Sequence, residues 1–220
     1  MKPHEGHRKS APSEVTVEIV TVSTSRYNQM ESGEEYTDEA GDAAKNESEK
    51  IGFIVSSRRV VSDNAPALRA CVRRFLSGNA DALLFTGGTG ISHRDITIET
   101  VGDFFEKELD GFGELLRRAS FSRVGAASAL TRATAGVAKG KLILCMPGSP
   151  DAVRTAMKVF GREIPHALFV ARSRYAQYLG MLLSTWSAQA VVPPLRFQTL
   201  LNPFEKRNLT AVALLFPIWQ

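Results

Sequence analysis

Short apolar stretches recur along the chain, and each gives way to polar or glycine-containing sequence. The stretches Val15–Val22, Phe53–Val61, Ala82–Thr86 and Leu142–Met146 are rich in β-branched and bulky apolar residues. Such runs are typical of strands that are buried on both faces of a parallel sheet. The pattern therefore predicts a strand at each of these positions.

Helices are predicted between these stretches, because apolar residues recur there at helical spacing. Asp63 or Asn64 can cap one helix, and Thr97 can cap another that carries Ile98, Val101, Phe105 and Leu109 on one face. Further helices are expected in the second half of the hydrophilic region 27–50, over 111–121, and from Pro150 onward. Alternation of buried strands with amphipathic helices predicts an α/β fold, with a mostly parallel sheet covered on both faces.

With 220 residues, 44% hydrophobic and 23% charged, the chain is long enough for one domain with a substantial core and tails. We assign the domain to residues 14–174, a disordered tail to 1–13, and an extension without a definite pattern to 175–220. The formal charge of +4 suits an anionic ligand, but so small an excess is also common among enzymes. We therefore expect no binding to nucleic acid.

The cysteines and the N-terminus bear on the compartment. Cys71 and Cys145 both lie in apolar segments, where a free thiol behaves as a small buried hydrophobe, and this indicates a reducing compartment. Residues 1–13 lack the apolar segment of a signal peptide. The uncharged stretch Tyr175–Leu195 contains too many polar residues and prolines for a membrane span. We therefore expect a cytoplasmic protein without a membrane segment.

The segment "TGGTG", Thr86–Gly90, follows a predicted buried strand and precedes a predicted helix. Glycines at such a position leave backbone N–H groups unobstructed, near a helix N-terminus that favours negative charge. Both a phosphate-binding loop and a tight turn without a ligand fit this pattern. The glycine spacing matches neither a P-loop nor the dinucleotide-binding fingerprint.

Charged residues near this loop strengthen the interpretation as a site. Asp95 follows closely enough to hold a divalent ion beside a bound phosphate, and Arg94 can neutralise charge on the same ligand. Asp63 follows another predicted strand, where it can either cap a helix or face a ligand at the carboxyl edge of the sheet. The loop Pro147–Ser149 reaches the same edge.

These motifs resemble a known family. "TGGTGISHRDITIETV", "EKELDGFGELLRRASF", "SALTRATAGV" and "LCMPGSPDAV" are similar to the signature of the MoaB/MogA molybdenum cofactor biosynthesis proteins, to which gephyrin-like G domains also belong. The resemblance, over roughly 15–172, implies a three-layer α/β/α domain that assembles as a homo-trimer or homo-hexamer. It also implies molybdenum cofactor biosynthesis by Mg²⁺- and ATP-dependent adenylylation of molybdopterin, before a downstream protein inserts the metal.

The resemblance also implies roles for individual residues. Asp63 and Asp95 would be catalytic and would hold Mg²⁺. Substrate contacts would come from Ser25, Asp38, Gly41, Thr86, Gly87, Gly88, Thr89, Gly90, Arg94, Thr131, Pro147, Gly148 and Ser149. His93 is expected to be an exposed loop residue, and His166 to be structural.

Two departures from the family pattern leave alternatives open. Members usually read "VSDS" and "DTSG" or "DKSG", whereas this chain has Thr24 in "VSTS" and Ala40 in "DEAG". These changes motivate a second hypothesis, a non-catalytic molybdopterin-binding, carrier or scaffold protein of the same fold. A third possibility is the related domain of competence-damage proteins, against which "TGGTG" and "RDIT" argue.

Overall fold

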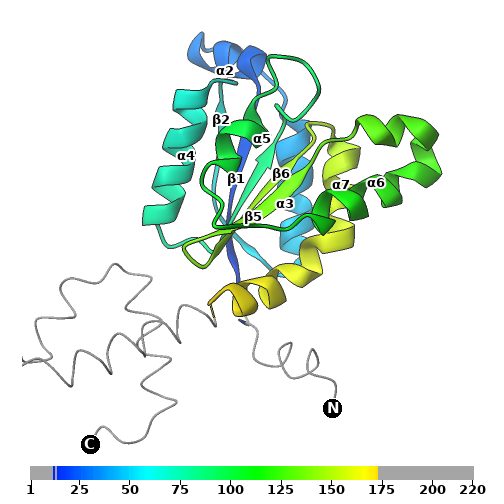
Figure 1. The fold of residues 1–220 in the computed structure, drawn as a ribbon. Helices are drawn as coiled ribbons and strands as arrows, with labels where there is room; N and C mark the ends of the chain where they lie inside the picture. Colours follow the sequence, from blue (N-terminus) through cyan, green and yellow to red (C-terminus); the bar gives the residue numbers. More distant parts are fainter. Residues whose placement is uncertain (1–11, 13, 173–220) are drawn as a thin grey trace, which may run out of the picture.

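The computed structural model describes residues 12 and 14–172. The rest of the predicted N-terminal tail and the predicted C-terminal extension lie outside the described residues. Within the described part, six strands form one sheet in the order β2-β1-β3-β6-β5-β4 (Figure 1). The strands are β1 (Thr16–Val22), β2 (Ile54–Val61), β3 (Ala82–Thr86), β4 (Lys107–Glu108), β5 (Thr134–Ala138) and β6 (Lys141–Met146).

The sheet is mostly parallel, as predicted. Strands β2, β1, β3 and β6 run parallel, whereas β5 is antiparallel to β6 and β4 is antiparallel to β5. Every residue of β3 and β6 is buried, which explains their continuous apolar runs. Because the parallel strands point the same way, the segments that follow them open onto one edge.

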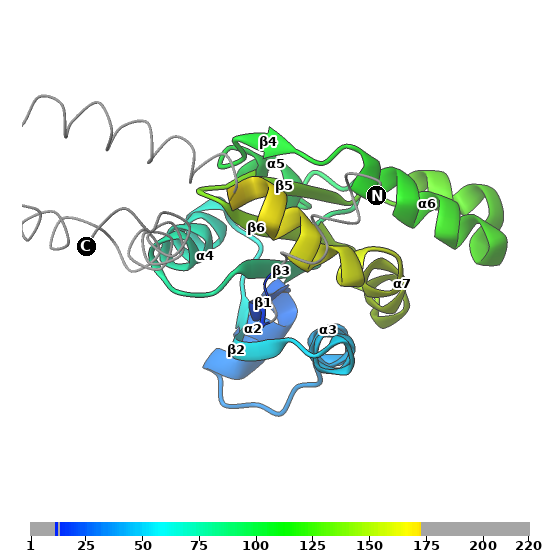
Figure 2. The ribbon, with the colours of Figure 1, turned by 90° about the horizontal axis from the view of Figure 1, so that it is seen from below.

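Helices cover both faces of the sheet, which confirms the predicted three-layer α/β/α fold (Figure 2). Helices α3, α6, α7 and the helix 164–172 pack against one face, and α4 and α5 pack against the other. The α-helices are α2 (Thr24–Glu31), α3 (Glu39–Ile51), α4 (Ala65–Ser77), α5 (Thr97–Gly102), α6 (Gly111–Val124) and α7 (Pro150–Phe160). Two short 3₁₀ helices, η1 (Gly125–Leu130) and η2 (Gly161–Glu163), follow α6 and α7. None of the helices in the described residues has the length and apolar character that a bilayer span requires.

The start of α4 decides between the two roles proposed for Asp63. Asn64 is the cap, since its side chain accepts a hydrogen bond from the N–H of Ala67 at 2.9 Å. The side chain of Asp63 is therefore not needed to begin the helix. At α7, Pro150 is the first helical residue, as predicted, and Ser149, which was expected to contact substrate, is the cap.

The predicted helix from Thr97 to Leu109 is wrong over its second half. Helix α5 ends at Gly102, and Thr97 is its first residue rather than its cap. The chain then turns to pair with β5, where the N–H of Leu109 donates to the carbonyl of Ala135 at 2.7 Å. A Cβ on Gly136 would lie 2.3 Å from the ring of Phe105, so this glycine leaves the space that Phe105 fills.

Lys141 is buried at the start of β6, and its ammonium group caps the C-terminal end of α4. Nζ donates to the carbonyls of Phe75 at 2.9 Å and Gly78 at 2.7 Å, and lies 4.8 Å from the centre of the Phe75 ring. A cation there interacts favourably with the negative end of the helix.

Replacing Lys141 with methionine should therefore destabilise the protein by about 1–3 kcal/mol, because two buried carbonyls lose a charged donor. Urea unfolding measures this loss. Lys139→Met, in the adjacent exposed turn, is the matched control and should change stability by less than about 0.5 kcal/mol. Equal midpoints for the two variants would show that the buried ammonium contributes nothing.

Candidate functional site

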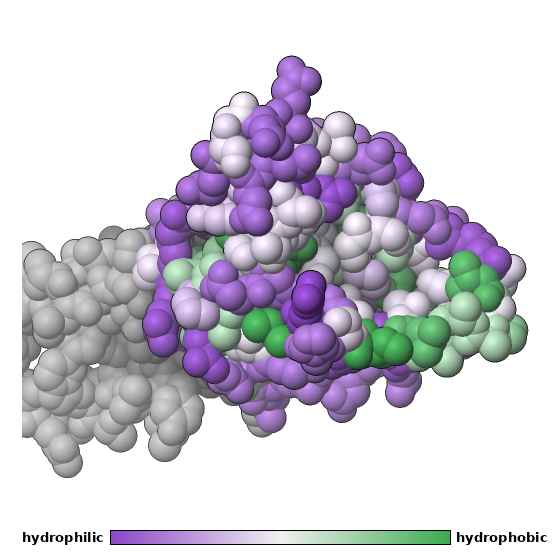
Figure 3. All heavy atoms as spheres, turned by 90° about the horizontal axis from the view of Figure 1, so that it is seen from above, coloured by the Kyte–Doolittle hydropathy of each residue, from purple (hydrophilic) through white to green (hydrophobic). Residues whose placement is uncertain are grey.

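Four segments meet at the carboxyl edge of the sheet. Ser23 and the start of α2 follow β1, and the loops 62–64, 87–96 and 147–149 follow β2, β3 and β6. Figure 3 looks onto the molecule from this side and shows near-neutral surface bordered by hydrophilic residues and, along one side, by hydrophobic ones. The topology therefore brings together most of the residues that the sequence singled out, from positions far apart in the chain.

The glycines after β3 allow the loop to pass close to its neighbours. Gly87 and Gly88 have φ angles of 98° and 63°, a region that favours glycine. A Cβ on Gly87 would lie 2.4 Å from the carbonyl oxygen of Val22, and a Cβ on Gly148 would lie 3.1 Å from the Cα of Gly87. The backbone of the loop after β3 therefore packs directly against the end of β1 and against the loop after β6, with no side chain between them.

Asp63 and Asp95 both lie close to this glycine loop, Asp63 beside Gly88 and Asp95 beside Gly90. A Cβ on Gly88 would lie 2.9 Å from Oδ2 of Asp63, and a Cβ on Gly90 would lie 2.7 Å from Oδ2 of Asp95. Oδ1 of Asp63 is buried, and no donor among the described residues bonds to it. Oδ2 of Asp95 accepts the N–H of Ser92 at 3.1 Å. The edge thus holds two carboxylates with acceptor capacity left for a ligand.

The pKa of Asp63 is raised above its usual value, first by burial and then by the negative charge of Asp95, with the backbone N–H of Ile96 offsetting part of the shift. A raised carboxyl pKa means that the native state binds the proton more tightly than the unfolded chain does. Stability is therefore lost as the pH rises through the native pKa.

Without divalent cations, Asp63→Asn should accordingly be more stable than the wild type at neutral pH. The difference in melting temperature should shrink as the pH falls below the ordinary carboxyl range, where both states of the wild type are protonated. Thermal unfolding across this pH range measures it, with the exposed Asp110→Asn as control. A difference in melting temperature that stays constant with pH would contradict a raised pKa of Asp63.

Two contacts that the sequence did not predict hold the loop. Thr97, expected to cap a helix, donates its hydroxyl to the carbonyl of Gly87 at 3.0 Å. Arg132 donates from Nη1 to the carbonyl of Gly90 at 2.8 Å and forms an ion pair with Glu99. Burial alone would raise the pKa of Glu99, but the hydrogen bond and charge of Arg132 hold it below its usual value. Arg132 thereby connects the segment before β5 to the glycine loop.

Three residues expected to contact substrate instead belong to a buried network. Both oxygens of Asp38 have protein partners: Oδ1 accepts the N–H of Gly41 at 3.0 Å, and Oδ2 accepts the hydroxyl of Thr21 at 2.8 Å and a guanidinium N–H of Arg58 at 2.7 Å. The hydroxyl of Thr86 donates to that of Thr21 at 3.4 Å. A Cβ on Gly41 would lie 2.1 Å from Oδ2 of Asp38, which explains this glycine. We therefore assign Asp38, Gly41 and Thr86 to positioning the edge.

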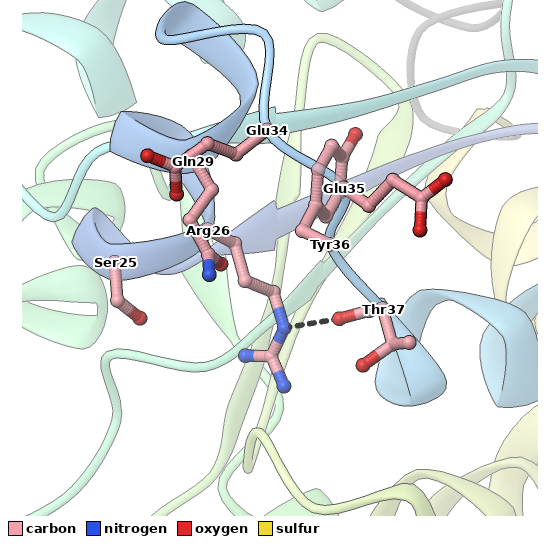
Figure 4. A pocket seen from close by; sticks show the side chains of 7 residues that line it. All are labelled: Ser25, Arg26, Gln29, Glu34, Glu35, Tyr36 and Thr37. Atoms are coloured by element: carbon pink, nitrogen blue, oxygen red, sulfur yellow. Dashed lines mark hydrogen bonds between the residues drawn. The ribbon is translucent and has the colours of Figure 1, made fainter.

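The remaining expected contacts fall around the loop. Ser25 is exposed and lines a hollow of about 760 Å³, whose wall is formed by α2 and residues 34–37 (Figure 4). Arg26 also lines the hollow and spans it to residues 34–37 by donating from Nε to the carbonyl of Thr37 at 2.7 Å. A volume of this size is in the range of small-molecule sites. The hollow begins one residue from Thr24, which contacts Asp63.

The other residues that the sequence singled out differ in exposure and in the contacts they make. Arg94 and His93 are exposed in the loop, Thr89 is buried beside the glycines, and Thr131 precedes the Arg132 contact. The hydroxyl of Ser149 accepts the N–H of Ala152 at 3.2 Å, so it caps α7, and His166 contacts Glu163. Among the residues that the structure describes, no hydrogen-bond or ion-pair partner is seen for the side chains of Thr89, Arg94 and Thr131.

The cysteines take no part in chemistry at this edge. Both are free and buried. Burial and the charge of Glu18 raise the pKa of Cys71 to about 11, and burial raises the pKa of Cys145 as well. A thiolate is the nucleophilic form, so neither thiol is poised to react at neutral pH. The chemistry therefore falls to the carboxylates and the loop.

Residues 18–166 match the family described as a probable molybdopterin binding domain. Over 151 residues the chain is 39% identical to the probable molybdopterin adenylyltransferase of Methanocaldococcus jannaschii, a match that covers 68% of this chain and 90% of that protein. Over 172 residues it is 39% identical to the molybdopterin adenylyltransferase of Pyrococcus furiosus, covering 76% of this chain and 98% of the relative.

Solved structures agree with these matches. The fold is similar to the crystal structure of the tungsten cofactor synthesizing protein MoaB from Pyrococcus furiosus, with a TM-score of 0.66 and 34% identity over 74% of this chain and 99% of the other. A structure of MogA gives a TM-score of 0.63 at 31% identity, covering 71% of this chain and 99% of that chain. The chain therefore belongs to the molybdopterin-binding family of the MoaB and MogA proteins.

Proposed function

We propose that this protein acts in molybdenum cofactor biosynthesis as a molybdopterin adenylyltransferase, which uses Mg²⁺ and ATP to transfer AMP to the terminal phosphate of molybdopterin. The observation that carries the proposal is the pair of carboxylates, Asp63 and Asp95, beside Gly88 and Gly90 of a glycine loop that follows a buried strand. Relatives with the name molybdopterin adenylyltransferase support it.

The reaction requires no covalent intermediate with the protein. An oxygen of the molybdopterin phosphate forms a bond to the α-phosphorus of ATP, the bond from that phosphorus to the β-phosphate bridging oxygen breaks, and pyrophosphate leaves. Both reactants are anions, so catalysis depends on neutralising charge and aligning the groups. The N–H of Gly87 donates to the carbonyl of Met146, but the N–H groups of residues 88–90 are suited to hold phosphate oxygens, and Arg94 is suited to compensate their charge.

The carboxylate pair fits Mg²⁺. Residues 14–172 contain no cluster of three or more His, Cys, Asp or Glu side chains arranged for a metal, so a site made only of protein ligands is not present there. Mg²⁺ is commonly held by one or two carboxylates together with substrate phosphates and water. Asp63, with a buried oxygen that lacks a donor, and Asp95 would hold the ion, which would supply charge neutralisation when bound.

The second hypothesis, a carrier or scaffold that binds molybdopterin without turnover, rested on Thr24 and Ala40. Ala40 lies on the buried face of α3 and packs in the core, and Thr24 contacts the backbone of Asp63. Binding of molybdopterin with no consumption of ATP would favour the carrier. The retained carboxylate pair favours the enzyme.

We also propose a cytoplasmic homo-trimer or homo-hexamer that passes its product to a downstream metal-insertion protein. Exposed apolar side chains on α6 and η1 support self-association, namely Leu115, Phe121, Val124 and Leu130. Light scattering of the purified protein measures the mass of the assembly. A monomer at micromolar concentration would contradict this part of the proposal.

Adenylylation is tested by incubating the purified protein with molybdopterin, Mg²⁺ and ATP, and identifying the product by mass spectrometry. The expected product is adenylylated molybdopterin, with one pyrophosphate released for each molecule formed. Product no greater than that of a boiled control would exclude the enzyme, and retained binding of molybdopterin in the same preparation would then identify a carrier.

A further inference from the structure

Thr24 links the ends of β1 and β2 at the residue that bears a catalytic carboxylate. Its hydroxyl oxygen accepts a hydrogen bond from the N–H of Asp63 at 3.1 Å and lies 3.2 Å from the hydroxyl of Ser62. The two strand ends are joined one residue earlier, where the N–H of Ser23 donates to the carbonyl of Val61 at 2.9 Å. Thr24 therefore extends the pairing of the strands into the loop that carries Asp63.

The main chain of Asp63 helps to place its carboxylate. The buried Oδ1 accepts no hydrogen bond from the described residues, and the carboxylate receives a backbone hydrogen bond from Ile96 on the side of the glycine loop. On the far side of Asp63, Asn64 is committed to capping α4, and its N–H donates to the carbonyl of Ser62 at 2.9 Å. The contact with Thr24 is therefore the one that fixes the Asp63 peptide from the direction of β1.

We infer that Thr24 is a positioning residue for Asp63, holding its peptide so that the carboxylate lies beside Gly88. The inference rests on the proposed function for its effect on turnover, although the contact itself is independent of it. A hydroxyl suits this task, because it accepts the hydrogen bond without adding a third negative charge to Asp63 and Asp95. Small displacements of a catalytic group have large effects on rate.

Thr24→Val and Thr24→Ser test the inference together. Valine keeps the branched shape but cannot accept the hydrogen bond, so kcat should fall by about 10-fold or more, with the dissociation constant of molybdopterin changed by less than about 2-fold. Serine keeps the hydroxyl and should restore most of the lost kcat. Thr155→Val is the matched control, since that threonine also loses hydrogen bonds, to Arg123 and the carbonyl of Asp151, but lies on α7.

A second measurement does not require activity. Hydrogen exchange of the Asp63 amide should be about 10-fold faster or more in Thr24→Val than in the wild type, and Thr24→Ser should return it toward the wild-type rate. Wild-type kcat in Thr24→Val, or no rescue by serine, would overturn the inference. If the wild type transfers no AMP, the proposed function fails, and amide exchange alone decides whether Thr24 holds Asp63. Unchanged exchange in Thr24→Val would then overturn it.

Discussion

Asp95→Asn is expected to lower kcat by about 100-fold or more, while the affinity for molybdopterin changes little. Asparagine has the same shape and keeps a side-chain oxygen that can accept the N–H of Ser92, the bond that Asp95 makes at 3.1 Å. The loop should therefore keep its conformation. What the variant loses is one of the two negative charges that would hold Mg²⁺ beside the reacting phosphates.

The effect of Asp95→Asn on turnover has to be compared with its effect on binding. Single-turnover rates at saturating ATP measure turnover, and direct titration with molybdopterin measures binding. Asp103→Asn is the matched control. That aspartate follows α5, is exposed, and forms an ion pair with Arg69 of α4. Equal losses of turnover and binding in Asp95→Asn would indicate a ligand contact rather than a role in holding the metal.

Gly88→Ala is expected to lower stability by about 2–4 kcal/mol and to abolish measurable turnover. The added Cβ would lie 2.2 Å from the hydroxyl of Thr97 and 2.9 Å from Oδ2 of Asp63. Thr97 cannot easily move, because its hydroxyl and its N–H donate to the carbonyls of Gly87 and Gly88 at 3.0 and 2.9 Å. The displacement therefore falls partly on Asp63, at the centre of the site.

Gly33→Ala separates the effect of space from the effect of backbone strain. Gly33 has a φ of 73°, close to the 63° of Gly88, but a Cβ there would meet nothing within 4 Å. Its replacement should cost about 1 kcal/mol and leave turnover unchanged. Denaturant unfolding and turnover of both variants make the comparison. If Gly88→Ala behaves like Gly33→Ala in both measurements, the close approach of Gly88 to Asp63 has no functional meaning.

The four parallel strands β2, β1, β3 and β6 could be predicted from sequence, and the antiparallel strands β5 and β4 could not. Strands β3 and β6 are buried throughout, so their apolar runs carry a strong signal. Strand β5 consists mainly of small residues, because Gly136 accommodates the ring of Phe105. The apolar side chains of Phe105 and Leu109 match helical spacing, but they reflect this tertiary contact, which no local pattern reveals.

Helix α2 was not predicted, because it has no buried face. None of its residues is buried, so no apolar face marks it, and its start depends on the hydroxyl of Ser23, which accepts the N–H of Arg26. Helix α3 was predicted from composition alone, and its small residues Ala40, Ala43 and Ala44 do form the buried face. Helix α2 thus has a local cap but no apolar face, whereas α3 has a buried face made of small residues, so neither gives a strong hydrophobic pattern.

The part of the candidate site that lies in sequence motifs could be predicted. Asp63, Asp95 and the glycines meet at one edge because parallel strands deliver them there. Arg132 was missed because its contact with Gly90 joins residues 42 apart in the chain, through a backbone carbonyl that any residue could supply. Asp38 was expected at the substrate, but its place in a buried network depends on Thr21 and Arg58 from two different strands.

The release of pyrophosphate from ATP, measured with and without molybdopterin in the wild type and in the Asp63→Asn, Asp95→Asn double variant, tests the central claim most directly. The wild type should release pyrophosphate only when molybdopterin is present, in a one-to-one ratio to the adenylylated product. The double variant should bind molybdopterin but release none. Release by the double variant at the wild-type rate, or no release by a wild type that binds molybdopterin, would contradict the claim that these carboxylates form the catalytic centre.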